Sequence, residues 1–139
     1  MTSFDDVQSG SVITYPYLWF READSGETEG RKLRPSAVAL RLKRDKGADL
    51  IVLLAITSKH PAPSQAAVEI PENEKRRAGL EADKRLWIVL DEYNTDTVGE
   101  SLYLVPRSLT GNFGKTFFLT LLRAFAKVRL KARRVDRNE

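Results

Sequence analysis

The sequence predicts a mainly β protein, a small barrel or sandwich, followed by one amphipathic helix. Up to Pro106, short runs of β-branched and aromatic residues alternate with loops rich in Gly, Pro and charged residues, which is typical of a small all-β fold. From Lys115 onward the apolar spacing changes to that of a helix. The 139 residues are expected to form one domain, 1–139.

The first half of the chain carries the clearest strand signals. Residues 11–20, SVITYPYLWF, predict a strand that Pro16 restricts to an edge or a bend. Residues 36–44 alternate apolar and polar positions, and residues 50–57, LIVLLAIT, form an apolar run suited to a central strand buried on both faces. The turn DKGAD between them predicts a hairpin. The polar segment 21–32, with two glycines, is expected to be a mobile loop.

The region after Thr57 predicts shorter elements. Residues 66–70 form a short strand, residues 71–80 a charged turn or a single helical turn, and residues 85–93, RLWIVLDEY, another strand. The polar stretch 94–100 then separates this strand from a short apolar piece, 101–105. About five to seven strands are expected in all.

The last predicted element is an amphipathic helix over residues 115–131. One face of it carries apolar side chains at positions i, i+3, i+4, i+7 and i+10, namely Phe118, Leu121, Leu122, Phe125 and Val128. This face has to cover the sheet or a partner. Residues 132–139 are expected to form a basic tail.

The distribution of charge indicates an anionic partner. From Lys115 onward eight basic residues stand against two acidic ones, whereas the rest of the chain has fifteen against seventeen. A basic carboxy-terminal end on a weakly acidic body favours nucleic acid as a partner. The alternative is a solubilising tail after a helix.

Composition narrows the possible chemistry. Without cysteine the chain has no disulfide, thiol nucleophile or Cys-type zinc site, and His60 is its only imidazole. No spaced carboxylate cluster suggests a metal site, so no metal and no cofactor are expected. The amino terminus has no apolar core, and no apolar run reaches the roughly 18 residues of a membrane span, which predicts a cytoplasmic protein with no membrane partner.

Five short motifs follow one another along most of the chain: GSVITYPYLW at residue 10, GRKLRPSAVALR at 30, VLLAITSKHP at 52, AGLEADKRLWIVLDEYN at 78 and GNFGKTFFLTLLRAFAKV at 111. In this order and spacing they resemble the PemK/MazF family of bacterial toxins. The resemblance implies an SH3-like barrel with a carboxy-terminal helix, and usually a homodimer. It also implies an endoribonuclease that cuts single-stranded RNA and is blocked by a small antitoxin protein.

The resemblance assigns the catalytic residues. Arg34, in the sequence Lys-x-Arg-Pro, matches the family's catalytic arginine, and Thr57 with Ser58 matches the Thr-Ser at the end of the third strand. These residue types suit cleavage without metal, in which the ribose 2′-OH attacks the adjacent phosphorus. A guanidinium stabilises the charge of the phosphorane with two parallel hydrogen bonds, and hydroxyl groups position the phosphate.

The general acid and base are less clearly marked. Asp91 lies where some relatives carry a catalytic Asp, but those relatives have an arginine two positions earlier, where this chain has Val89. His60 is the side chain whose unperturbed pKa lies near neutrality, and it follows Thr57 by three residues. A lone histidine in a Pro-rich loop is also often a bystander.

Further residues are candidates for RNA binding. Lys32 and Lys59 flank the matched motifs with positive charge, and Tyr17 and Trp19 precede the loop that in relatives lies beside the RNA groove. Two other functions stay open: a binding module of the same fold that inhibits a protein partner such as a gyrase, and a diverged relative that has lost catalysis.

Overall fold

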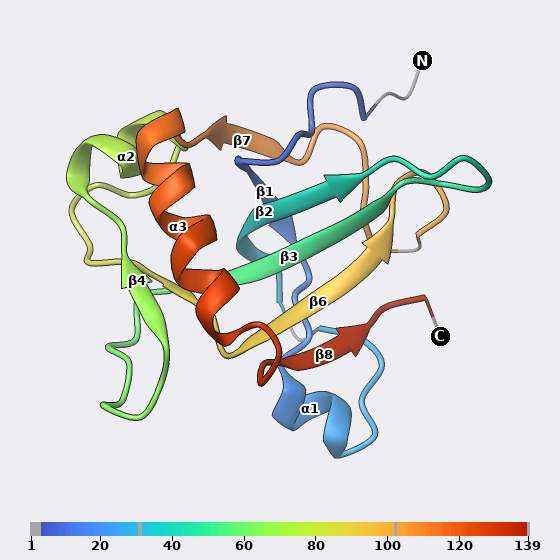
Figure 1. Ribbon diagram of the computed structural model, residues 1–139, viewed down its shortest axis with the longest axis horizontal. Helices are drawn as coiled ribbons and strands as arrows, with labels where there is room; N and C mark the ends of the chain where they lie inside the picture. The colour runs from blue at the N-terminus through green and yellow to red at the C-terminus, as the bar shows by residue number, and fades with distance from the viewer. Residues whose placement is uncertain (1–3, 31, 102, 139) are drawn as a thin grey trace.

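The strand β3 (Leu50–Thr57) lies at the centre of the sheet and pairs with three neighbours (Figure 1). The computed structural model describes residues 4–30, 32–101 and 103–138. This part of the chain holds one sheet of eight strands and three helices. Along the sheet the order is β4 (Ala67–Glu69), β5 (Trp87–Val89), β3, β2 (Arg34–Leu42), β1 (Ser11–Tyr15) and β7 (Leu109–Asn112).

Two more strands branch from β3. β6 (Glu92–Thr97) pairs antiparallel with Leu50–Leu53, the first half of β3, whereas β5 pairs with its last two residues. β8 (Arg133–Asp136) pairs with β6 in parallel, whereas the other strand pairs described are antiparallel. The mainly β prediction is therefore confirmed.

The sheet is open, so the predicted closed barrel is wrong. Within the described ranges β4, β7 and β8 each have a single strand partner, and no ladder joins one of them to another. The strand count of eight also exceeds the expected five to seven. The strands that were not predicted are β6, which comes from the segment 85–97, β7 before α3, and β8 at the carboxy-terminal end.

The segment predicted as one strand over 85–93 forms two. β5 ends at Val89 and β6 begins at Glu92, so each pairs with a different half of β3. The polar residues after Tyr93 belong to β6 and not to a loop. Their polarity is compatible with a buried strand because their side chains are hydrogen bonded: Asn94 pairs with the backbone N–H and C=O of Leu18 (2.9 and 2.8 Å), and Asp96 accepts from Tyr15 Oη (2.6 Å).

The predicted hairpin is confirmed, and its alternating side chains build two apolar layers. β2 and β3 pair antiparallel from Leu42↔Leu50 to Ser36↔Ala55, and β3 is buried on both faces. Ala37, Leu54 and Ile56 face one layer, and Val38, Leu53 and Ala55 face the other. This follows from the two-residue period of a strand.

The helix α3 (Lys115–Val128) covers the first layer, as Figure 1 shows. Leu121 is fully buried, and Phe118, Phe125 and Val128 of the predicted apolar face pack against the same layer. The helix ends three residues earlier than predicted. Its beginning is held by α2 (Glu72–Arg77), because Glu74 Oε1 accepts the Gly114 N–H at 2.7 Å. No helix in the described residues combines the length and the apolar character that a membrane crossing needs.

The residues expected to form a basic tail form β8 instead. Val135 is buried opposite Asn94 of β6, and Arg137 is 5% exposed. The Arg137 guanidinium donates to the Pro16 carbonyl oxygen (2.7 Å), and its Cζ lies 3.9 Å from the centre of the Tyr103 ring. The positive charge of this arginine is thus used inside the fold.

The segment between β1 and β2 contains a helix where a strand end and a mobile loop were expected. β1 stops at Tyr15, before Pro16, and α1 (Phe20–Asp24) begins after Trp19. Glu22 Oε1 accepts the Trp19 N–H (3.2 Å), and Glu92 Oε1 accepts the Phe20 N–H (2.9 Å). These carboxylates satisfy N–H groups that a helix start leaves unpaired.

Candidate functional site

A pocket of about 210 Å³ opens where the beginning of β2 meets the end of β3. Segments far apart in the sequence supply its walls: the start of α1, β2, β3, the loop 58–66 and β5. Its lining residues are Trp19, Arg21, Arg34, Thr57, Lys59, Pro61, Gln65 and Val89. We call it the Arg34 pocket.

Strand pairing brings Arg34 to this place. It is the first residue of β2 and pairs with Tyr15 of β1. Pro35 follows it and favours an extended backbone at Arg34, as a strand requires. Continuing the β2–β3 register by two residues beyond Ser36↔Ala55 sets Arg34 opposite Thr57, and both side chains line the pocket.

The Arg34 guanidinium is partly desolvated and has spare hydrogen-bonding capacity. Its Nε is buried and has no hydrogen-bond partner among the described residues. Burial lowers the pKa of Arg34 below its usual value, the Glu22 carboxylate acts in the opposite direction, and Arg21 adds to the lowering. Arginine stays charged in proteins, so the pocket contains a cationic donor that lacks an acceptor. An anion is the ligand that satisfies such a group best.

Trp19 supports the guanidinium. The Arg34 Cζ lies 4.9 Å from the centre of the Trp19 ring, and the Arg21 Cζ lies 5.0 Å from it. The Trp19 ring in turn meets the edge of Tyr17, with centroids 5.1 Å apart and planes at 68°. Cation–π contacts of this kind hold an arginine side chain in one orientation. Trp19 therefore contacts the Arg34 guanidinium directly and orients it.

Tyr17, predicted to bind RNA, lies in the core. It is 1% exposed, and its hydroxyl donates to Glu92 Oε1 at 3.2 Å. Burial and the nearby Glu92 carboxylate raise the pKa of Tyr17 well above its ordinary value. Desolvation likewise raises the pKa of Glu92. The ring of Tyr17 has no free face for a base, and its contact in this region is with Trp19.

The Thr57 hydroxyl already accepts one hydrogen bond and can donate another. Its Oγ1 accepts the Lys59 N–H at 3.1 Å, so its O–H remains available as a donor. Lys59 is exposed and, with Arg21 and Arg34, brings three cationic side chains to the lining. No acidic side chain is among the described residues that line the pocket. The site is therefore built to receive negative charge.

The structure brings together four of the nine residues predicted for the site: Arg34, Thr57, Lys59 and Trp19. Ser58 and Lys32 are exposed and do not line the pocket. His60 turns away to Trp87, with ring centroids 4.9 Å apart, and its Nδ1 lies 3.0 Å from the Pro61 carbonyl oxygen.

Asp91 also lies outside the pocket. It occupies the break between β5 and β6, and its carbonyl oxygen accepts the Arg133 N–H at 3.0 Å. Within the described residues, no cluster of three or more His, Asp or Glu side chains is arranged to hold a metal ion.

Four lining residues were not predicted: Arg21, Pro61, Gln65 and Val89. Arg21 lies in a short helix and Gln65 in a loop, and neither carries a motif. Their positions depend on strand pairs between distant segments, so no local pattern marks them.

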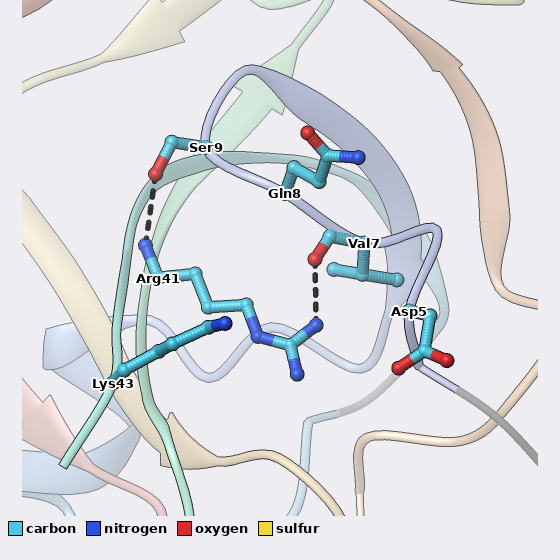
Figure 2. Close-up of a pocket in the computed structure, with 6 residues that line it drawn as sticks. All are labelled: Asp5, Val7, Gln8, Ser9, Arg41 and Lys43. Atoms are coloured by element: carbon cyan, nitrogen blue, oxygen red, sulfur yellow. Dashed lines mark hydrogen bonds between the residues drawn. The ribbon is translucent and has the colours of Figure 1, made fainter.

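A roomier pocket of about 460 Å³ lies beside the amino-terminal segment and has a different character (Figure 2). Its arginine, Arg41, donates to the Val7 carbonyl oxygen at 2.7 Å and to that of Phe4, and its Nε pairs with Asp49 at 3.0 Å. This guanidinium holds the segment before β1 in place. Since the Nε and Nη1 donors of Arg41 already have acceptors, one of them a carboxylate, the Arg34 pocket is the better candidate for binding an anion.

No family model and no curated protein matches the sequence.

Proposed function

We propose that the protein is a metal-independent endoribonuclease that cleaves single-stranded RNA through attack of a ribose 2′-OH on the adjacent phosphorus. One observation carries the proposal: Arg34, with a buried donor that lacks a partner, and Thr57, with a free hydroxyl donor, line one cationic pocket. The PemK/MazF resemblance assigns both residues to catalysis, together with Ser58, which lies outside the pocket.

The size of the pocket favours a polymeric substrate. Pockets that enclose a free small molecule usually measure about 300 to 1,000 Å³, whereas the Arg34 pocket measures about 210 Å³. It has room for one phosphate and part of its neighbour, while the rest of the ligand lies outside. Lys59 and Arg21 are placed to meet the adjoining phosphates of such a strand.

The residues act on the transition state as follows. The 2′-oxygen forms a bond to phosphorus, the bond to the 5′-oxygen breaks, and the proton lost by the 2′-OH is balanced by one gained at the departing 5′-oxygen. Negative charge builds up on the non-bridging oxygens. Arg34 stabilises this charge through two parallel N–H donors, and Thr57 holds the phosphate by donating its O–H.

The described lining residues include no carboxylate and no histidine. We therefore assign the rate enhancement to charge stabilisation and positioning, with proton transfer to and from solvent. The same observation favours a second candidate, an RNA-binding module of the same fold that does not cleave. Further features of the proposal come from the resemblance, which implies an SH3-like fold, a homodimer and a small antitoxin partner. The proposed cytoplasmic location comes from the sequence expectation.

The test is cleavage of end-labelled single-stranded RNA by the full chain. We expect the wild-type protein to cleave it and Arg34→Ala to bind it but fail to cleave. Arg44→Ala is the matched control, because it removes the same charge from the exposed turn between β2 and β3. Binding without cleavage by the wild type would favour the binding module. Equal cleavage by wild type and Arg34→Ala would overturn the proposal.

A further inference from the structure

Gln65 lines the Arg34 pocket with its carboxamide held in one orientation. Its backbone N–H donates to the Ala62 carbonyl oxygen at 2.9 Å, and its side-chain Oε1 accepts the Ala62 N–H at 2.8 Å. A backbone N–H needs an acceptor, so the atom facing Ala62 has to be the oxygen of the amide. The Nε2 group, with two N–H donors, has no partner among the described residues.

The lining of the pocket around Gln65 has a positively charged part and an apolar part. Arg21, Arg34 and Lys59 supply positive charge, whereas Pro61 and Val89 supply apolar surface. A phosphate oxygen accepts from an amide as well as from the cations, but it makes no use of the apolar walls. A nucleobase uses both the amide and the apolar walls, because its faces are apolar and its edge carries hydrogen-bonding groups.

We propose that Gln65 selects the base next to the phosphate held by Arg34, favouring uracil or guanine over cytosine or adenine. This inference depends on the proposed function, since it concerns the same site. On their base-pairing edges uracil presents O4 and guanine presents O6, and these carbonyl oxygens accept from Nε2. At the same position cytosine presents its N4 amino group and adenine its N6 amino group, and these would set donor against donor and leave both without a partner.

The usual pairing of glutamine with adenine is disfavoured at this position. That pairing is bidentate and needs the amide oxygen as acceptor together with the amide nitrogen as donor. Here Oε1 is already used by Ala62. Gln65 therefore recognises a base through its N–H donors alone. A discrimination of about tenfold is expected, which corresponds to the lower part of the range for a hydrogen-bond donor left without a partner.

The test uses a single-stranded RNA library of randomised sequence, with cut ends and bound fractions both sequenced. We expect the wild type to enrich uracil or guanine at one fixed position beside the cut. Gln65→Glu keeps an acceptor for the Ala62 N–H but replaces the two donors with acceptors, so the preference at that position should shift about tenfold toward cytosine or adenine. Gln8→Glu, at an exposed position in another part of the chain, controls for the added negative charge.

The two readouts separate the two proposals. If no RNA is cut, the proposed function fails, and the bound fraction still decides the role of Gln65 by the same shift in preference. If the base preference of Gln65→Glu equals that of the wild type, in cleavage or in binding, the specificity role is wrong. An equal shift with Gln8→Glu would also overturn it, because the cause would then be net charge.

Discussion

Arg34, the first residue of β2, and Thr57, the last residue of β3, line the same pocket, two residues beyond Ser36↔Ala55, the last pair of the β2–β3 ladder. The paired strands hold both backbones in place, and β3 is buried on both faces. The guanidinium and the hydroxyl therefore extend from fixed positions in the sheet. This is the preorganised geometry that stabilisation of a charged transition state needs.

Arg34→Lys tests the guanidinium beyond its charge. An ammonium cannot form two parallel hydrogen bonds, and it loses the contact with Trp19, whose ring centre lies 4.9 Å from the Arg34 Cζ. Cleavage should fall by about 10²- to 10³-fold, close to the loss in Arg34→Ala. Single-turnover cleavage rates measure this, with thermal unfolding as the check on folding. A lysine variant with the wild-type rate would show that charge alone is sufficient.

Thr57→Val and Thr57→Ser separate the hydroxyl from the shape of the side chain. Valine removes the donor at nearly constant volume, and cleavage should fall by about tenfold or more, since one hydrogen bond to a charged group is lost. Serine keeps the hydroxyl and should retain most of the activity. Comparable loss in both variants would assign Thr57 a packing role.

Cleavage should proceed in excess EDTA and leave a 2′,3′-cyclic phosphate and a 5′-hydroxyl. The chain has no cysteine and one histidine, and internal attack by the ribose oxygen forms these ends directly. Product ends are identified by mass spectrometry. Activity that stops with EDTA and returns with magnesium, or products with a 5′-phosphate, would require another mechanism.

Glu92→Gln should change how stability depends on pH. Folding raises the pKa of the Glu92 carboxyl, chiefly through desolvation. Its contribution to stability is fully present below the unfolded pKa of about 4.3 and is lost as the pH rises through the raised pKa of the folded state. Glutamine keeps an acceptor for the Phe20 N–H and has no charge to bury, so the stability of Glu92→Gln relative to wild type should increase with pH.

Urea unfolding between pH 4 and pH 7 measures the difference in free energy of unfolding between Glu92→Gln and wild type. Glu100→Gln is the control, because Glu100 is exposed and makes no ion pair that the structure describes. If the free energies of unfolding of Glu92→Gln and wild type differ by the same amount at every pH in this range, folding leaves the pKa of Glu92 unchanged.

Arg137→Ala should destabilise the fold even though it lies two residues from the end of the chain. The truncation leaves the Pro16 carbonyl oxygen without its donor and removes the contact with Tyr103, so a loss of about 2 to 3 kcal/mol is expected. Arg134→Ala removes a more exposed arginine, which lies in β8 just before Arg137, and should cost less than about 1 kcal/mol. Equal losses in urea unfolding would show that the burial of Arg137 adds no stability.

Local patterns in the sequence were enough to predict the hairpin of β2 and β3, the helix α3 and the short strand β4. β2 and α3 follow from periods of two and 3.6 residues, and β3 follows from a continuous apolar run; each of these patterns is a property of the segment itself. The motifs also predicted that Arg34 and Thr57 belong to one site, and both line the same pocket.

Tertiary structure alone decided the features that depend on distant partners. β6 is a strand because Asn94 and Asp96 find hydrogen-bond partners in Leu18 and Tyr15, some eighty residues earlier. β8 is a strand because β6 offers it an edge, and the sheet stays open because no strand in the described residues joins its ends. Gln65 lies in the pocket lining because the fold brings the loop 58–66 close to β2 and α1, which are distant in the sequence. Polar residues look alike in a sequence whether water or a buried partner satisfies them, and only the fold supplies the partner.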